Sequence, residues 1–176
     1  MSQEDFVLGT KNPLAYLIRL QSIRRAFPGA HILILVRHPY HTIKSWKRTF
    51  SHLRDAAISE SAVFNFANES QRRDIDKLVE IKDLITRRAS LWNYLATQIL
   101  AHMQDTVVIR YEDLIANPFP NLQEIYQGLF PGASISDVQS LSSRNSPLLD
   151  DLDGSERACI KDVCGASAGR LGYEDL

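Results

Sequence analysis

LVRHPYHTIKS, residues 35–45, decides the fold of this chain, because it joins an apolar run to an arginine, a proline and a predicted helix. The run before the arginine, HILILV at residues 31–36, predicts a strand buried on both faces of a parallel sheet. Arg37 then lies at the carboxyl edge of the sheet, where ligands collect in open α/β folds. Pro39 suits the first turn of a helix, whose free N–H groups favour an anion, and Ser45 follows about two turns later. The pattern predicts an anion site, although an arginine paired with a surface carboxylate and an ordinary serine fit it equally well.

The composition narrows the class of protein. A chain of 176 residues with 44% hydrophobic residues is long enough for one domain with a substantial core. The formal charge of -1 argues against a broad nucleic-acid surface, which needs clustered excess Lys and Arg. No run approaches the roughly twenty apolar residues of a membrane span, and the amino end lacks the pattern of a signal peptide. A cytoplasmic protein is therefore expected. A Golgi-lumenal location stays open if an amino-terminal anchor is missing.

Two cysteines, Cys159 and Cys164, lie five residues apart on a predicted helix, a spacing that predicts different faces. We expect free thiols, because the pattern of a disulfide framework or of a metal site is missing. Further along the chain, predicted helices and strands alternate, and residues 51–73 read as a polar, flexible or substrate-facing excursion. The predicted strands are residues 6–9, 31–36 and 106–111, and the predicted helices are residues 14–27, 75–103, 122–129 and 155–168. The first strand, helix and second strand form a βαβ unit, which requires a parallel pair and a right-handed crossover.

Four segments in a fixed order carry a resemblance to a known family. They are TKNP at residues 10–13, FPGAHILILVRHPYHTIKSW at 27–46, VVIRYEDLIANP at 107–118 and LGY at 171–173. The chain resembles the carboxyl-terminal two-thirds of sulfotransferases, which move a sulfuryl group from 3'-phosphoadenosine 5'-phosphosulfate (PAPS). The resemblance implies a single α/β domain over residues 1–176, truncated at the amino end. Its expected architecture is a three-layer fold of the P-loop-NTPase-like type, in which helices flank a parallel sheet.

The resemblance also implies roles for single residues. Arg37 and Ser45 inherit binding of the 3'-phosphate of PAPS, which agrees with the anion site read from the residues themselves. Tyr111 corresponds to a residue near the adenine, although a tyrosine packed under the sheet edge fits equally well. Lys11 matches a lysine close to the reacting centre, and it is the one catalytic residue that the resemblance supplies.

No motif in the sequence marks the residue that takes the proton of the sulfuryl acceptor. Many cytosolic relatives carry a histidine where this chain has Pro13. His38 and His41 are chemically able to act as a base, but their position near the 3'-phosphate suggests a supporting or surface role. Glu4 and Asp5 are speculative alternatives. Glu112 and Asp113 are expected to order the turn after the second strand by accepting backbone N–H hydrogen bonds.

One part of the family pattern is missing. Nothing in the sequence matches the P-x-S-G-T-T loop that cradles the 5'-phosphosulfate in sulfotransferases. The main expectation is a PAPS-dependent sulfotransferase, without a metal, that acts on a hydroxyl or amine of a carbohydrate or small molecule. The alternative is a relative that binds a nucleotide or partner without catalysis. A kinase-like phosphotransferase is disfavoured, because G-x-x-x-x-G-K-[ST] is also missing. Loss of the loop strand exposes a sheet edge, which a second copy of the chain in a homo-oligomer would cover.

Overall fold

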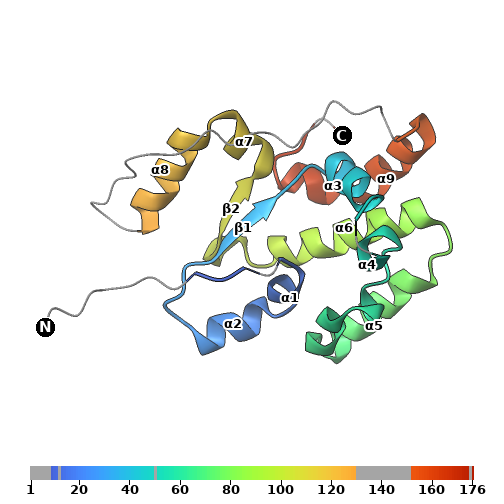
Figure 1. The fold of residues 1–176 in the computed structure, drawn as a ribbon, viewed down its shortest axis with the longest axis horizontal. Coiled ribbons are helices and arrows are strands. Elements are labelled where there is room, and N and C mark those ends of the chain that lie inside the picture. The colour runs from blue at the N-terminus through green and yellow to red at the C-terminus, as the bar shows by residue number, and fades with distance from the viewer. Residues whose placement is uncertain (1–8, 12, 50, 130–151, 175) are drawn as a thin grey trace, which may run out of the picture.

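The computed structural model describes residues 9–11, 13–49, 51–129, 152–174 and 176. Most of the described chain is helical, and two short strands lie at its centre (Figure 1). In chain order the elements are α1 (Pro13–Ile18), α2 (Leu20–Ala26), β1 (Leu33–Val36), α3 (Pro39–Trp46), α4 (Ser51–Arg54), η1 (Ile58–Glu60), η2 (Ala62–Phe66), α5 (Glu69–Glu80), α6 (Leu84–Leu100), η3 (Met103–Asp105), β2 (Val107–Arg110), α7 (Tyr111–Ala116), α8 (Pro118–Leu129) and α9 (Gly154–Arg170).

β1 and β2 form a parallel pair in the register Leu33 with Val107 through Val36 with Arg110. The α/β class and the strands predicted over residues 31–36 and 106–111 are confirmed here, and within the described residues the sheet has these two strands. The predicted burial of β1 on both faces is wrong. Ile34 and Val36 are buried, whereas Leu33 and Leu35 are 48% and 52% exposed, because the described helices pack closely over only one face of the strand.

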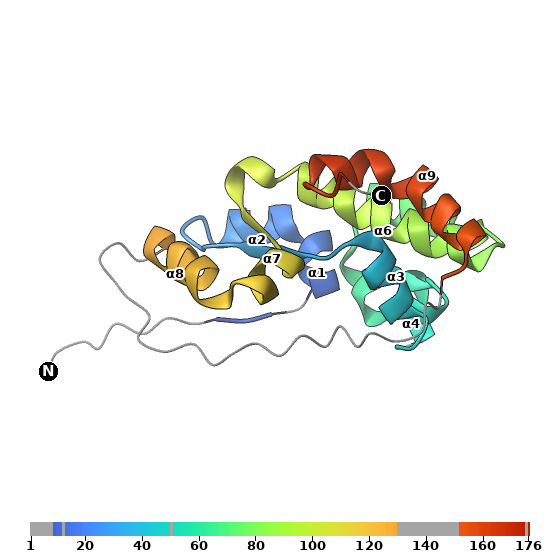
Figure 2. The ribbon, with the colours of Figure 1, turned by 90° about the horizontal axis from the view of Figure 1, so that it is seen from above.

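α9 lies along α6, and the two views in Figures 1 and 2 agree on this arrangement. Small side chains on both helices allow the close approach, and Ala89, Ile160, Cys164 and Ala168 are fully buried between them and the strands. Burying a side chain such as Ile160 contributes about 1.5–3 kcal/mol. This helix pair, with β1 against it, forms the main core.

The two cysteines of α9 are free thiols, as expected. Both contact α6, but they differ in exposure, since Cys164 is buried and Cys159 is partly exposed. The Cys164 thiol donates to the backbone oxygen of Ala89 at 3.4 Å, and the Cys159 sulfur lies 3.4 Å from the Thr86 hydroxyl. Burial raises the pKa of the Cys164 thiol to about 12, so Cys164 acts as a core residue.

Two predicted helices are each divided in the structure. The helix predicted over residues 75–103 is α5 and α6, because Asp83 accepts a hydrogen bond from the Thr86 N–H at 2.8 Å and starts a new helix. The helix predicted over residues 14–27 is α1 and α2, which meet at Arg19. The predictions of α8 and α9 are confirmed to within a few residues. Residues 6–8 of the first predicted strand lie outside the described residues.

The prediction that residues 51–73 are a flexible excursion is wrong, whereas the alternative, that they face a substrate, stays a prediction. This segment forms α4, η1, η2 and the start of α5. Ala57 is buried, and Ala56, Ile58 and Ala67 are buried in a second core cluster that also contains Ile18 of α1 and Leu91 of α6. The average polarity of the segment concealed these apolar residues. Among the described residues, every helix is too short or too polar to serve as a membrane span.

Candidate functional site

The carboxyl ends of β1 and β2 lie side by side, because Val36 pairs with Arg110. Arg37 and Tyr111 are the next residue of each strand, and the guanidinium carbon of Arg37 lies 4.9 Å from the centre of the Tyr111 ring. A guanidinium at this distance is attracted by the face of the ring. The structure therefore brings together two of the residues that the sequence pointed to, at the predicted edge of the sheet.

The backbone of Arg37 is anchored from two helices. Its carbonyl oxygen accepts hydrogen bonds from the Thr42 hydroxyl of α3 at 3.2 Å and from the indole N–H of Trp92 of α6 at 3.3 Å. Trp92 is 4% exposed and packs in the core, and its indole N–H gives it this second role. These bonds fix the position from which the Arg37 side chain leaves the sheet.

The expectation that Glu112 and Asp113 order the turn after β2 through backbone N–H groups is only partly met: Asp113 bonds the Arg110 side chain, and Glu112 bonds the turn after β1. The Glu112 carboxylate accepts a hydrogen bond from the His38 backbone N–H at 3.1 Å and another from the Tyr173 hydroxyl at 2.8 Å. The Tyr173 oxygen also lies 3.1 Å from the Val36 carbonyl oxygen, and burial and Glu112 raise the pKa of this hydroxyl. The LGY segment is thus tied to the strand end that carries Arg37.

His38 caps α3. Its Nδ1 accepts a hydrogen bond from the Tyr40 backbone N–H at 3.2 Å, so Nδ1 carries no proton in this state. The ring stands edge-on to Tyr173 with 5.2 Å between the ring centres. Burial, followed by the neighbouring His41, lowers the pKa of His38. His38 therefore supports the turn, as the sequence suggested, and is mostly neutral at neutral pH.

Positive charge gathers on one side of α3. The pKa of His41 is lowered by burial, then by Arg37, and further by Lys44 and Arg157, while Glu112 opposes the shift. Ser45 lies one helical turn after His41, which places both on the same side of α3. Three cations and one carboxylate act on this imidazole, so the charges around it are positive in sum and favour an anion nearby.

A cavity of about 520 Å³ lies beside Arg37. Leu14 of α1, Thr42 and Trp46 of α3 and His52 of α4 contribute to its lining, and Ser45 is not among the described lining residues. Lys11 is exposed in the segment just before α1, whose residues form one wall of the cavity. Arg37 thus stands between a positively charged helix face and an apolar hollow.

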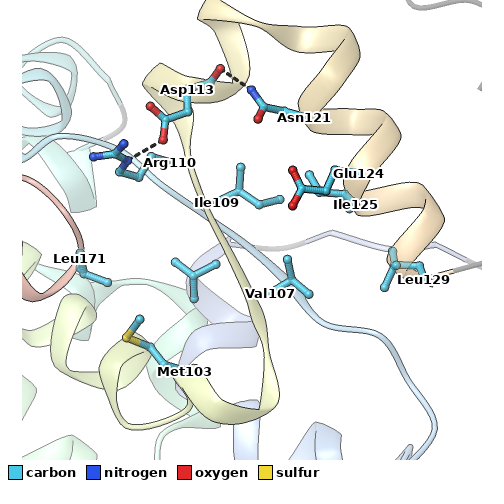
Figure 3. Close-up of a pocket in the computed structure, with 12 residues that line it drawn as sticks. Met103, Val107, Ile109, Arg110, Asp113, Asn121, Glu124, Ile125, Leu129 and Leu171 are labelled. Atoms are coloured by element: carbon cyan, nitrogen blue, oxygen red, sulfur yellow. Dashed lines mark hydrogen bonds and ion pairs between the residues drawn. The ribbon is translucent and has the colours of Figure 1, made fainter.

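A second cavity, of about 510 Å³, runs along β2 and α8 (Figure 3). Figure 3 shows the Arg110 side chain bonded to Asp113, with a distance of 2.6 Å from Nε to the carboxylate, and Glu124 also lines the hollow. Arg110 donates to the Gly172 carbonyl oxygen as well. Arg110 offsets the charge of Asp113, and Glu124 leaves the charged side chains of the lining net negative, so this cavity does not suit the phosphates of the nucleotide.

Sequence reasoning missed the cavity beside Arg37 and the histidine in its wall. His52 falls in residues 51–73, which the sequence predicts to be a polar, flexible or substrate-facing excursion, but no motif marks the histidine itself. The link from Tyr173 to Glu112 was also missed, because it joins residues far apart in the chain. Glu4 and Asp5, the two acidic candidates for the base, lie outside the described residues. Within the described part of the chain, no group of three or more His, Cys, Asp or Glu side chains is placed to hold a metal ion.

Comparison with known proteins agrees with the geometry of this edge. The model of one family, described as the sulfotransferase family, matches residues 2–130 of the 176. The match includes the TKNP segment, the strand and helix around Arg37 and the strand before Tyr111, and it ends before the LGY segment. No curated protein and no solved structure matched the chain. The family match covers well over half of the sequence, and the chain therefore belongs to the sulfotransferase family.

Proposed function

We propose that this chain binds the 3'-phosphoadenosine portion of PAPS at the carboxyl edge of β1 and β2 and takes part in sulfuryl transfer to a hydroxyl or amine. One observation carries the proposal. The Arg37 guanidinium is held against the Tyr111 ring at this edge, next to the positively charged side of α3. Family membership supports sulfuryl transfer as the chemistry.

Arg37 and Ser45 are the proposed ligands of the 3'-phosphate. A guanidinium holds a phosphate through two parallel hydrogen bonds, and stacking on a ring restrains its orientation without using its N–H groups. Ser45 shares the side of α3 on which the cations act on His41, so its hydroxyl lies on the side that attracts the anion. Tyr111 contributes its ring beside Arg37, in the region proposed for the adenine.

Lys11 is the proposed catalytic residue. In sulfuryl transfer the acceptor attacks sulfur in line with the departing phosphate, and the protein positions the two partners and stabilises the charge that develops. An ammonium group close to that phosphate would supply such stabilisation. Lys11 precedes α1, a wall of the cavity beside Arg37, which supports a position near the reacting groups.

Calorimetric titration tests the binding half of the proposal. We expect the chain to bind 3'-phosphoadenosine 5'-phosphate (PAP) at least tenfold more tightly than adenosine 5'-monophosphate, which lacks the 3'-phosphate. Equal affinities, or no binding of PAP, would refute the proposed site. A transfer assay with PAPS then separates an enzyme from the alternative, a relative that binds the nucleotide without catalysis.

A further inference from the structure

The cavity beside Arg37 has the chemistry of a site for an apolar molecule. Its lining side chains are apolar except for Arg37, Thr42 and His52, and they include Trp46 and Trp92. Its volume of about 520 Å³ lies in the range of roughly 300–1,000 Å³ that is typical of small-molecule sites. A molecule that fills it buries mostly hydrocarbon and aromatic surface.

This cavity and the positively charged side of α3 suit different parts of a reaction. The cations that act on His41 (Arg37, Lys44 and Arg157) favour the phosphates of a nucleotide. Of these cations, only Arg37 also lines the cavity. A carbohydrate in the cavity would leave several hydroxyl groups against leucine and tryptophan side chains, and an unsatisfied buried hydroxyl is costly. An apolar molecule with one polar group matches the lining better.

The three polar side chains of the lining differ in whether they can accept a proton. The Thr42 hydroxyl already donates to the carbonyl oxygens of Arg37 and His38, at 3.2 and 3.1 Å. Arg37 carries a positive charge and does not take up a proton. His52, half-buried in α4, is the lining side chain that can accept one.

From this geometry we propose that the cavity binds the sulfuryl acceptor, that the acceptor is an alcohol or phenol with an apolar body, and that His52 takes its proton. This inference rests on the proposed function. In the step, the acceptor oxygen forms a bond to the sulfur of PAPS, and the bond between sulfur and the 5'-phosphate oxygen breaks. That oxygen keeps the electron pair as PAP leaves, and the acceptor proton passes to His52.

The chain provides its own reporter for binding. Its two tryptophans, Trp46 and Trp92, both line this cavity, so tryptophan fluorescence responds to an occupant. We expect 3-phenylpropan-1-ol to change the fluorescence in a saturable way and methyl glucoside, a carbohydrate of similar size, to have no effect. Saturable binding of the glucoside without binding of the alcohol would overturn the proposed acceptor class.

A matched pair of variants locates the binding. Leu35 lines the cavity, whereas Leu33 lies on the same face of β1 and is not among the described lining residues. Both are about half exposed, at 52% and 48%, so replacement by Asn disturbs folding to a similar and small extent. Leu35→Asn should weaken binding of the alcohol about five- to tenfold, and Leu33→Asn should not. Equal effects of the two changes would place the alcohol elsewhere and refute the site.

His52 is tested by turnover. His52→Gln should lower kcat for the alcohol by about 100-fold or more, with a much smaller change in KM, because only the proton transfer is lost. An unchanged kcat, or a wild-type chain that binds the alcohol and PAPS without transfer, would overturn this role. PAP affinity is measured on the same samples. If PAP binds and the alcohol does not, the acceptor site alone is refuted, whereas loss of PAP binding refutes the proposed function itself.

Discussion

Replacing Arg37 with alanine is the most direct perturbation of the candidate nucleotide site. The change removes a guanidinium that is held by stacking on Tyr111 and by the anchored backbone of β1. A hydrogen bond to a charged group contributes about 1.5–3 kcal/mol, so Arg37→Ala should weaken PAP binding by roughly 10- to 150-fold. The PAP affinity of Arg37→Lys should lie between those of the wild type and Arg37→Ala, because lysine keeps the charge but loses the paired N–H geometry.

Arg19 provides a matched control. Its guanidinium carbon lies 4.9 Å from the centre of the Phe66 ring, the same distance as that between Arg37 and Tyr111. Arg19 is exposed and is not among the described lining residues of either cavity. Both alanine variants change the formal charge from -1 to -2. Arg19→Ala should therefore leave PAP affinity within about twofold of the wild type.

Isothermal calorimetry at two salt concentrations measures both effects, with circular dichroism to confirm folding. A loss of PAP affinity confined to Arg37→Ala agrees with a direct contact. This loss should be smaller at high salt, because salt screens the phosphate contact. Equal affinity of the wild type and Arg37→Ala would refute the reasoning, and so would equal losses in the two alanine variants, which would indicate a general effect of charge.

Further measurements test the supporting structure. Tyr173→Phe removes the hydroxyl that bonds the edge carboxylate, so the free energy of unfolding in urea should fall by about 1–2 kcal/mol, and an unchanged value would argue against that bond. Gly172→Ala should destabilise the chain by about 1 kcal/mol or more, because φ is +84° and the new Cβ would lie 3.2 Å from the Arg110 guanidinium. Gly165→Ala, in open space on α9, should instead stabilise the chain by up to about 1 kcal/mol. If the melting temperatures of Gly172→Ala and Gly165→Ala shift in the same direction, this reasoning is contradicted. The pKa values of His38 and His41 lie below the ordinary 6.5, so the unfolded chain binds more protons, and the free energy of unfolding should fall as the pH drops from about 7 to 5. Replacing both histidines with Gln should flatten this slope in urea titrations, and an equally steep slope would show that other groups cause it.

Several features were predictable because their signals are local. The strand around Leu35, the arginine after it and the proline at the start of α3 are consecutive in the chain, so the edge position of Arg37 follows from neighbouring residues. The division between α5 and α6 also has a local signal in Asp83, but the apolar pattern continues from Ile81 to Leu84 and concealed it. The order of the four family segments was enough to indicate the family.

Tertiary structure alone decided what surrounds Arg37. Tyr111 reaches it through the register of two strands, and Tyr173 joins the same edge after α9 has packed along α6. The cavity with His52 forms where α1, α3, α4 and α6 meet around β1. Spacing along the chain predicts the face of a helix or strand on which a residue lies. Contacts between residues tens of positions apart depend on which faces pack together to bury apolar surface, and that outcome belongs to the whole fold.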